Sequence, residues 1–405
     1  MGKRSDAGTR EKDVRSDCWI EIELTDSGGP QVSLTSKVDV MYGESIVELC
    51  QEGLKRLGVE HARVTVEDAG ALPFTIMARL ETALRRLRPG VKEEFLPDMQ
   101  PFCTYETTRD RFRRSRLYLP GNEPKFFVNA GIHKPDGIIL DLEDSVTPSQ
   151  KDAAQTLVRN ALRQVNFYGA ERMVRINQIP RGLEDLDFIV PHNVHVILIP
   201  KCESGDHVYE VEKRTRELLK DHDISDPVYL MPIIESALGT IKSYEIASTS
   251  KYVIALAVGL EDYTADIGTQ RTTEGKESFW MRSQIVNAAR AAGVQPIDTV
   301  FSDVGDMDGL RESVLEAKSL GFEGKGCIHP RQIAVVNEAF APSESDITKA
   351  KKIVRAFEEA EAQGLGVVSL GSKMIDPPVV KRALKTVALA TATGKLAENW
   401  REEEV

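Results

Sequence analysis

The sequence lacks several features that would place it in a common class of protein. No apolar run approaches the ~18 residues of a membrane-spanning helix, and the first residues, MGKRSDAGTREKD, are too polar for a secretory signal. The 63 aspartates and glutamates outnumber the 52 lysines and arginines, giving a net charge of −11, and no segment clusters basic with aromatic residues as nucleic-acid grooves do. We therefore expect a cytoplasmic protein that binds neither membranes nor nucleic acids.

Cysteine is scarce, and its distribution excludes two kinds of structural site. The five cysteines are odd in number, widely spaced and set among apolar residues, so neither a disulfide framework nor a zinc motif is indicated. They are Cys18, Cys50, Cys103, Cys202 and Cys327. We expect them to be reduced core residues.

The length of 405 residues favours two or three domains at roughly 150 residues each. Near the N-terminus, CWIEIEL alternates apolar and polar residues, and QVSL, KVDVM and RVTVED add short strand-like segments. One helix is expected to open with a capping box from Ser45 to Glu48 and to end at Gly58, and a second to end at Pro89-Gly90. These segments predict a small α+β module. The expected parts are a polar tail (1–15), this module (16–90), a linker (91–113), a barrel (114–340) and a helical lid or arm (341–405).

Eight short apolar runs follow the linker, most of them separated by helical segments. They are RLYLP, GIILDLE, RMVRIN, HVILIPK, VYLMPIIE, YVIALAVG, IDTVFSD and GKGCIHP. Alternating strands and helices at this spacing favour an α/β fold with a closed (β/α)8 TIM barrel, and an open doubly wound sheet is the main alternative. No glycine fingerprint of a dinucleotide site follows the first run. In a barrel, the polar residues at the ends of the runs would surround the active site.

Two acidic residues at the ends of neighbouring runs predict a metal site. Glu235 follows the fifth run and Asp262 follows the sixth, and two carboxylates with open positions suit Mg²⁺. Glu143 and Asp144, after the second run, could hold the waters of the metal or act as acid and base. The alternative is that these acids only cap helix N-termini.

Three basic residues near the strand ends are further candidates. Arg175 ends the third run between apolar neighbours, and its guanidinium could stabilise an oxyanion or a substrate carboxylate, or could pair with the acids. Lys201 invites comparison with Schiff-base aldolases, although a chain with a carboxylate pair for a metal has no need of an imine. Arg114, before the first run, could bind a phosphate or only close the base of the barrel.

Several motifs in order resemble the citrate lyase beta-subunit family, the HpcH/HpaI group of citryl-, malyl- and citramalyl-CoA lyases. They are RRSRLYLPGNEPKFF, GIILDLEDSVTPSQKDAA, VRIN, MPIIESALG, GLEDYTADIG, KGCIHPRQIAVVN and GSKMIDPP. Separately, SDCWIEIE and VEDAGALPFTIMARLETALRRL resemble the gamma subunit of citrate lyase, an acyl carrier protein. The chain therefore resembles a fusion of carrier and lyase.

The resemblance implies a mechanism and partners. It implies a barrel assembled as a homotrimer, Mg²⁺ on Glu235 and Asp262, a role for Arg175 at the substrate, and Asp376 as an acid delivered into the neighbouring subunit. The implied reaction cleaves a hydroxy-acyl thioester such as citryl thioester to oxaloacetate and an acetyl thioester, beside an alpha subunit that exchanges the acyl group.

The carrier motif departs from the family pattern at its attachment serine. Relatives carry a phosphoribosyl-dephospho-CoA group on a serine two residues before an Asp, where this chain has Arg15, and Ser16 lies one place later. Ser16 is the best candidate, ahead of Ser5. If the modification is lost, the substrates become free CoA thioesters such as malyl- or citramalyl-CoA. A third reading is a non-catalytic scaffold that presents the carrier.

Overall fold

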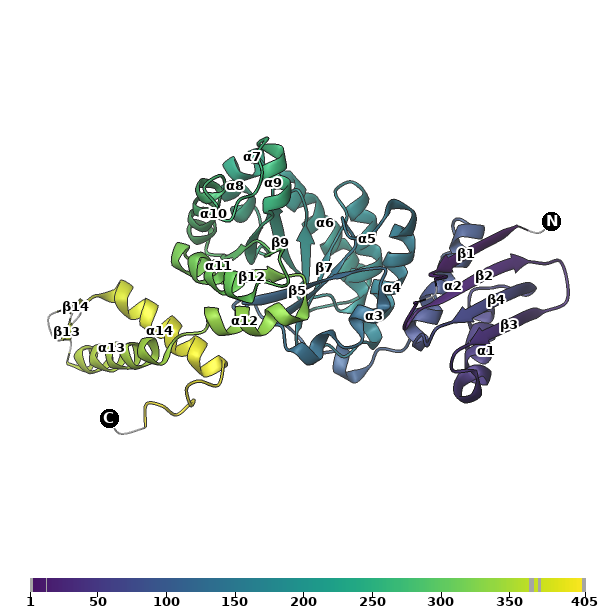
Figure 1. Cartoon of the computed structure of the whole chain (residues 1–405), viewed down its shortest axis with the longest axis horizontal. Coiled ribbons are helices and arrows are strands. Elements are labelled where there is room, and N and C mark those ends of the chain that lie inside the picture. The colour runs from purple at the N-terminus through teal and green to yellow at the C-terminus, as the bar shows by residue number, and fades with distance from the viewer. Residues whose placement is uncertain (1–2, 12, 364–367, 371–372, 403–405) are drawn as a thin grey trace.

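The computed structural model describes residues 3–11, 13–363, 368–370 and 373–402. Three parts follow one another along the chain: a small sheet-and-helix domain, a central barrel and a C-terminal helical arm (Figure 1). No helix in the described ranges is long and apolar enough to cross a bilayer. All five cysteines are buried and free, as expected.

The first domain is a four-stranded sheet covered by two helices. Its strand order is β1-β2-β4-β3, and only β3 and β4 run parallel. Its elements are β1 (Arg4–Gly8), β2 (Cys18–Leu24), β3 (Pro30–Ser36), α1 (Asp39–Arg56), β4 (Ala62–Asp68) and α2 (Pro73–Leu87). The alternation in β2 buries Cys18, Ile20 and Ile22 in the core of this domain, as the sequence pattern predicts.

Three local expectations for this domain are wrong. The expected polar tail contains β1, which is held by backbone pairing with β2 and buries only Ala7 of its side chains. The strand-like KVDVM forms a turn and the first residues of α1. Helix α1 therefore begins at Asp39, and the pair Ser45 and Glu48 lies inside the helix instead of capping it.

The central part is a closed barrel of eight parallel strands in the expected order. The strands are β5 (Ser115–Pro120), β6 (Gly137–Asp141), β7 (Glu171–Arg175), β8 (Val196–Ile199), β9 (Tyr229–Ile234), β10 (Ala255–Val258), β11 (Gln295–Asp298) and β12 (Gly324–Cys327). The helices are α3 (Pro124–Phe127), α4 (Lys151–Gln164), α5 (Arg181–Ile189), α6 (Gly205–Asp221), α7 (Ala237–Ile241), α8 (Ser243–Ser248), α9 (Leu260–Asp266), α10 (Phe279–Ala292), α11 (Met307–Leu320) and α12 (Pro330–Phe340). Short 3-10 turns are η1 (Pro101–Cys103), η2 (Ala130–His133), η3 (Pro148–Gln150) and η4 (Val190–His192).

The strands carry two apolar faces, as buried parallel strands do. One hydrophobic cluster lies between the strands and the surrounding helices. A second, smaller cluster fills the barrel interior, with Ile139, Met173 and Ile233 among its members. Because side chains alternate along a strand, the interior cluster shows which strand-end residues point into the barrel.

The segment between the two domains is packed and irregular. Phe95 is buried in the core of the first domain, and Cys103 is buried with its Sγ donating to the Val165 carbonyl. At the end of the segment, Arg113 forms an ion pair with Glu171 in which neither side chain is exposed. The sequence has no period here because the segment follows the surfaces of two folded parts.

The arm leaves the barrel after α12. It consists of α13 (Glu344–Ala362), the two-stranded β13 (Val368–Leu370) and β14 (Lys373–Ile375), and α14 (Pro377–Ala392). The two helices pack together around their own small core, which includes Val354, Val380 and Trp400 (Figure 1). Lys385 of α14 pairs with Glu323, which precedes β12, so the arm contacts the N-terminal end of the barrel.

Candidate active site at the barrel mouth

Three charged residues at strand ends continue the inward-facing rows of the barrel. Asp141, Arg175 and Glu235 each follow an apolar residue of the interior by two positions. Those apolar residues are Ile139, Met173 and Ile233. Because the strands are parallel, the three polar side chains meet at one mouth, at the C-terminal end where such barrels place their chemistry.

A cavity of about 380 Å³ opens at this mouth. Its polar lining is Tyr118, Asp141, Asp144, Ser145, Arg175, Glu235, Glu261, Asp262 and Thr299. The expectation that Glu235 and Asp262 would share one opening with Arg175 is therefore met in the geometry. A cavity of this size suits a small organic ligand.

Arg175 is held by two carboxylates. Its Nε and Nη2 donate to the two oxygens of Asp141, both at 2.6 Å, and its Nη1 lies 3.0 Å from Oε2 of Glu143. Burial alone would raise the pKa of Asp141, but the hydrogen bonds from Arg175 outweigh it and hold that pKa below its usual value. The guanidinium is therefore fixed in a fully ionised pair at the cavity wall.

Lys201 connects the remaining acids of the mouth. Its Nζ lies 3.3 Å from Glu143, 3.5 Å from Asp144 and 3.7 Å from Asp262. Burial alone would lower the pKa of Lys201, but these carboxylates raise it above its usual value. An ammonium kept charged in this way is a poor nucleophile, which argues against an imine-forming lysine.

Glu143 is buried but ionised. Burial would raise its pKa, but the charge of Arg175, a 3.0 Å hydrogen bond from Gln178 Nε2 and the charge of Lys201 lower it. The pKa of the adjacent Asp144 is shifted the other way by its own burial and by Glu143. Neighbouring acids whose pKa values are pushed apart suit opposite roles in proton transfer.

Glu235 is the most perturbed acid of the mouth. It is 5 % exposed, and its Oε1 accepts a 2.6 Å hydrogen bond from the backbone N–H of Lys201. Burial raises the pKa of Glu235 to about 7. The hydrogen bond from Lys201 lowers this pKa, and the charge of Asp262 raises it further. A carboxylate that is costly to ionise in a buried cavity is one that gains from a cation.

Gly259 leaves the space that Oε2 of Glu235 occupies. It follows the interior residue Ala257 by two positions, so it continues the same inward-facing row. A Cβ at Gly259 would lie 2.3 Å from Oε2 of Glu235. Any side chain here would push Glu235 out of place.

The donor set fits a magnesium ion that takes few protein ligands. Within the described residues, no group of three or more His, Cys, Asp or Glu side chains is arranged to hold a metal. Glu235 and the 43 %-exposed side chain of Asp262 line the same cavity, and two carboxylates with the remaining positions left to water and substrate are a common arrangement for Mg²⁺.

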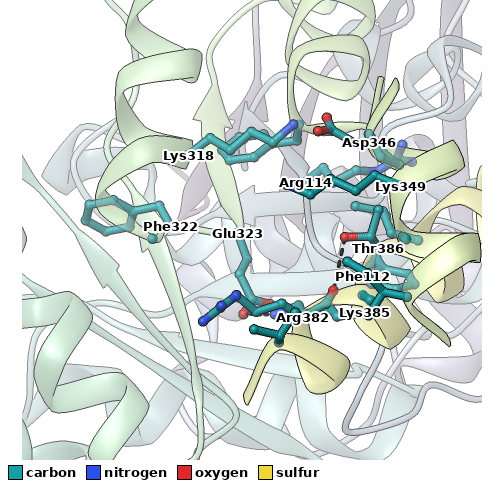
Figure 2. Close-up of a pocket in the computed structure, with 18 of the residues that line it drawn as sticks. Phe112, Arg114, Lys318, Phe322, Glu323, Asp346, Lys349, Arg382, Lys385 and Thr386 are labelled. Atoms are coloured by element: carbon teal, nitrogen blue, oxygen red, sulfur yellow. Dashed lines mark hydrogen bonds and ion pairs between the residues drawn. The ribbon is translucent and has the colours of Figure 1, made fainter. Parts of the chain in front are cut away.

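Arg114 lies away from this mouth. It pairs with both oxygens of Asp136 at 2.8 Å, next to the start of β5. There it lines a separate cavity of about 490 Å³ between the barrel base and the arm, together with Lys318, Arg382 and Lys385 (Figure 2). A phosphate held by Arg114 would therefore bind at the opposite end from Glu235.

Asp376 also lies outside the mouth of its own chain. It is the N-cap of α14, where its Oδ1 accepts from the backbone N–H of Val379 at 3.2 Å. The arm that carries it contacts the N-terminal end of the barrel. If Asp376 acts as an acid at a barrel mouth, that mouth belongs to another copy of the chain.

Ser16 lies at the end of the first domain that faces the barrel. Its backbone has φ +56°, and its N–H donates to the carbonyl of Ala69 at 3.2 Å. The neighbouring Asp17 is buried and accepts two 2.9 Å hydrogen bonds from Arg79.

Sequence reasoning missed Asp141 and Gly259. Asp141 is the last residue of the run GIILD, but the sequence-based prediction assigned roles only to Glu143 and Asp144, which follow it. The signal was the two-residue period, because Asp141 shares the parity of the interior residue Ile139, as Gly259 shares that of Ala257. This period accounts for Asp141, Arg175, Glu235 and Gly259, whereas Asp144 and Asp262 lie beyond the strands and do not follow it.

Comparison with known proteins agrees with this geometry. The HpcH/HpaI aldolase/citrate lyase family matches residues 114–330, which is more than half of the chain. The chain belongs to this family. Residues 3–87 match a second family, the malonate decarboxylase delta subunit, an acyl carrier family, so a carrier-like domain precedes the lyase. This match includes the strand in the expected polar tail.

Two curated relatives illustrate the similarity. The citrate lyase subunit beta of Leuconostoc mesenteroides subsp. cremoris is 40 % identical over 288 residues, which cover 70 % of this chain and 95 % of the relative. Human mitochondrial citramalyl-CoA lyase is 33 % identical over 292 residues, 69 % of this chain and 86 % of the relative. Because the family match and these relatives are lyases, the chain is a lyase.

A solved structure shows the same fold. The protein CitE of Mycobacterium tuberculosis, in complex with magnesium, acetoacetate and coenzyme A, superposes with a TM-score of 0.57 at 28 % identity. The similarity covers 70 % of this chain and 99 % of that one. The chain thus shares its overall fold with a citrate lyase family protein.

Proposed function

We propose that the chain is a Mg²⁺-dependent lyase that cleaves citryl thioester to oxaloacetate and an acetyl thioester, with the acyl group carried on its own first domain. The observation that carries the proposal is that Glu235 and Asp262 line one cavity beside Arg175. The citrate lyase beta subunits among the relatives and the carrier-like first domain support the choice of substrate.

Glu235 and Asp262 would hold the metal. When bound, Mg²⁺ supplies a Lewis acid that lowers the pKa of the substrate hydroxyl. Glu235 must lose its proton to serve as a ligand, and the backbone N–H of Lys201 keeps its carboxylate oriented when it does.

The cleavage needs a base for the hydroxyl and a cation for the departing enolate. The hydroxyl proton leaves, the O–H electrons form the carbonyl of oxaloacetate, and the carbon–carbon bond electrons pass to the thioester as an enolate. Glu143, which is ionised and lies 3.0 Å from the cavity-lining Arg175, would accept the proton, and Arg175 would stabilise the enolate oxygen. Protonation of the enolate carbon completes the acetyl thioester.

We assign that last protonation to Asp376 of a neighbouring subunit. In its own chain Asp376 caps α14 on the arm, and the arm contacts the far end of the barrel. A homotrimer in which arms are exchanged would bring the residue to a neighbouring mouth, and an alpha subunit would supply the acyl exchange. The test is an Asp376→Asn variant, which should lose turnover alone yet regain it when mixed with Glu235→Gln chains.

The metal assignment is tested by substitution of the two acids. Glu235→Gln and Asp262→Asn should each abolish Mg²⁺-dependent cleavage of citryl-CoA and weaken Mg²⁺ binding measured by calorimetry. Glu261→Gln is the matched control, because Glu261 lines the same cavity but is engaged by Arg271 at 2.7 Å. Full activity in either of the first two variants would refute the assignment.

A second function is favoured by the residue before Ser16. Arg15 stands where the attachment serine is expected, and the human relative is a citramalyl-CoA lyase. In this reading the carrier domain is vestigial and free malyl- or citramalyl-CoA is the substrate. The intact mass of the protein from its native host, with side-by-side assays of the three thioesters, separates the two functions. Measurable turnover by the isolated chain excludes a purely presenting scaffold.

A further inference from the structure

We propose that the first domain delivers its acyl group to the barrel of its own chain. In this arrangement the domain is permanently docked, Ser16 lies beside the rim of the catalytic mouth, and Arg79 is the residue that positions it there. The inference rests on the proposed function, because it takes Ser16 as the attachment point of a carrier arm.

Helix α2 is buried on both sides. Every residue from Phe74 to Leu84 is buried. Ile76 and Leu80 belong to the core of the first domain, whereas Phe74 and Ala78 belong to the cluster that lies under the barrel helices. A helix that is buried all round lies between two packed layers. The first domain and the barrel therefore share α2 as a structural element, unlike a carrier that swings on a tether.

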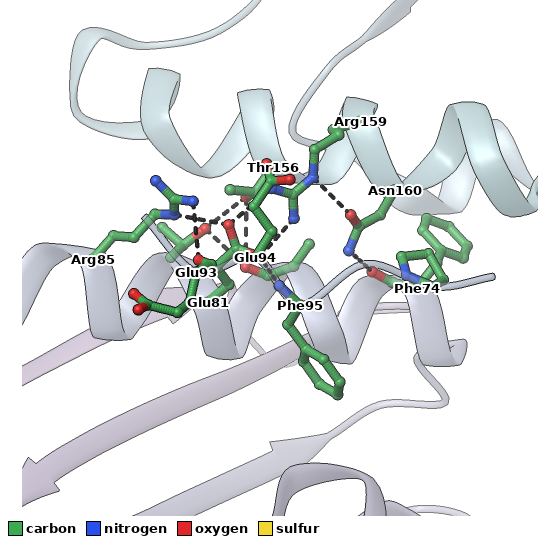
Figure 3. Close-up of polar contacts among 12 residues, drawn as sticks. Phe74, Glu81, Arg85, Glu93, Glu94, Phe95, Thr156, Arg159 and Asn160 are labelled. Carbon is green, nitrogen blue, oxygen red and sulfur yellow. Dashed lines mark hydrogen bonds and ion pairs between the residues drawn. The ribbon is translucent and has the colours of Figure 1, made fainter. Parts of the chain in front are cut away.

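Polar contacts complete the interface between α2 and α4 (Figure 3). The hydroxyls of Thr82 and Thr156 lie 2.7 Å apart, and Nδ2 of Asn160 donates to the Phe74 carbonyl at 3.1 Å. Glu81 accepts two hydrogen bonds from Arg159 with both side chains fully buried. Buried polar groups that satisfy each other fix one register of packing.

A short chain of contacts links Ser16 to the mouth. Nη2 of Arg79 bonds both to Asp17, the neighbour of Ser16, at 2.9 Å and to the carbonyl of Asn122 at 3.0 Å. Asn122 lies two residues after the end of β5, and Gly121 between them donates its N–H to the Asp141 carbonyl at 2.8 Å. Asp141 lines the mouth cavity.

The strands of the first domain agree with this placement. The strand β1 runs toward the barrel and β2 runs away from it, so the start of β2 lies at the barrel side of the sheet (Figure 1). Ser16 precedes the first residue of β2, Cys18, by two positions. Two atoms at the Arg79 bridge, Nη1 of Arg79 and Oδ1 of Asn122, are buried without a hydrogen-bond partner in the described part of the chain. The bridge thus retains capacity for a further polar group next to Ser16.

The geometry of the bridge is tested by a distance measurement that does not depend on activity. Spin labels on Ser16→Cys and Ile328→Cys report the separation of the attachment point from the mouth, since Ile328 lines the cavity and is exposed. Labelling is selective because the five native cysteines are buried. We expect one narrow, short distance distribution, unchanged when labelled chains are diluted with unlabelled ones. A broad distribution, or one that disappears on dilution, would overturn the inference.

The role of Arg79 is tested in the same labelled chain. The double variant Asp17→Asn/Arg79→Gln removes the bridge without leaving an unpaired buried charge, and it should broaden the distribution while circular dichroism stays native. Its matched control is Arg10→Gln/Glu67→Gln, an arginine–carboxylate pair within the first domain, which should leave the distribution narrow. Equal broadening of the distance distribution by the two double variants would show that Arg79 does not position Ser16.

Delivery within one chain is tested by mixing two inactive proteins. Ser16→Ala cannot carry the acyl group, and Glu235→Gln cannot cleave it. If delivery stays within a chain, the mixture shows no turnover of carrier-bound substrate above that of its components. Recovery of activity would overturn the inference while leaving the proposed function intact. An unmodified Ser16 in protein from the native host would instead remove the carrier-dependent function, and this inference with it.

Discussion

Glu81 in α2 and Arg159 in α4 form a doubly hydrogen-bonded ion pair in which neither side chain is exposed to solvent. The two residues are 78 positions apart and belong to different domains. Each residue has a second partner, since Arg85 lies 2.7 Å from Glu81 and Glu94 lies 2.9 Å from Arg159. Removing one member of the central pair therefore leaves the other with a single charged partner in a buried site, whereas replacing both with apolar residues is often neutral.

The first prediction follows from this pair. Arg159→Met or Glu81→Leu alone should lower the free energy of unfolding by about 1.5–3 kcal/mol in chemical denaturation, because the remaining charge keeps one other partner. The double variant should recover part of that loss. The control is the exposed pair of Arg4 and Glu23, where Arg4→Ala should cost less than about 1 kcal/mol. A double variant as unstable as the single ones would show that packing, and not charge, governs the interface.

The second prediction concerns Asp141, which holds Arg175 with two bonds of 2.6 Å. Asp141→Asn should lower kcat about 10- to 100-fold with little change in Mg²⁺ affinity, because it frees the guanidinium but touches neither proposed metal ligand. Asp136→Asn is the matched control, since Asp136 holds Arg114 in the same way at the barrel base. Equal losses in both variants would indicate a general effect on folding.

The third prediction concerns pH in the absence of magnesium. The pKa of Glu235 is about 7 in the folded chain, above the ~4.3 of an unfolded one, so the folded state holds an extra proton between these values. The stabilisation is complete below about pH 4 and is lost as pH rises through 7. Glu235→Gln should therefore gain stability relative to the wild type by on the order of 3 kcal/mol between pH 4 and 8.

Denaturation curves with EDTA at several pH values measure this difference. Added Mg²⁺ should reduce the stability difference between Glu235→Gln and the wild type at high pH. The reason is that Mg²⁺ binds to and stabilises only the native wild-type protein, which keeps the carboxylate. A gap between the two proteins that is constant across pH would contradict the burial of an ionisable Glu235.

The fourth prediction concerns Gly259. Gly259→Ala should weaken Mg²⁺ binding and activity together, because its Cβ would lie 2.3 Å from Oε2 of Glu235. Gly305→Ala is the control: its Cβ would approach only the side chain of Asp303, at 3.2 Å on the surface. Normal metal affinity in Gly259→Ala would mean that Glu235 can move without losing its function.

The barrel could be predicted from sequence because each of its strands is marked by a pattern of neighbouring residues. Each strand is a short apolar run, and parallel closure brings the residue after each run to the same mouth, so Glu235, Asp262 and Arg175 were found together. Asp141 was missed although its run was recognised, because only the two-residue period shows which end residues point inward.

The first domain was harder to predict because part of its structure depends on contacts between residues that are far apart in the sequence. KVDVM has the alternation of a strand, yet it forms a turn and the start of α1, and Ser45 with Glu48 matches a capping box inside the same helix. The β1 strand is mostly polar, and backbone pairing with β2 holds it in the sheet. The burial of Glu81 could not be foreseen, since its partner Arg159 lies in another domain.

Because α2 packs against both the first domain and the barrel, the two domains cannot be separated without exposing part of this helix. A fragment ending after α2 would expose Phe74 and Ala78 to water and remove Arg159 from Glu81, which would keep only Arg85 as a charged partner. Such a fragment would need several new hydrophilic side chains along that face before it could be handled as an independent carrier. The two domains are therefore joined by a shared core as well as by the chain, and each barrel has one carrier-like domain packed against it.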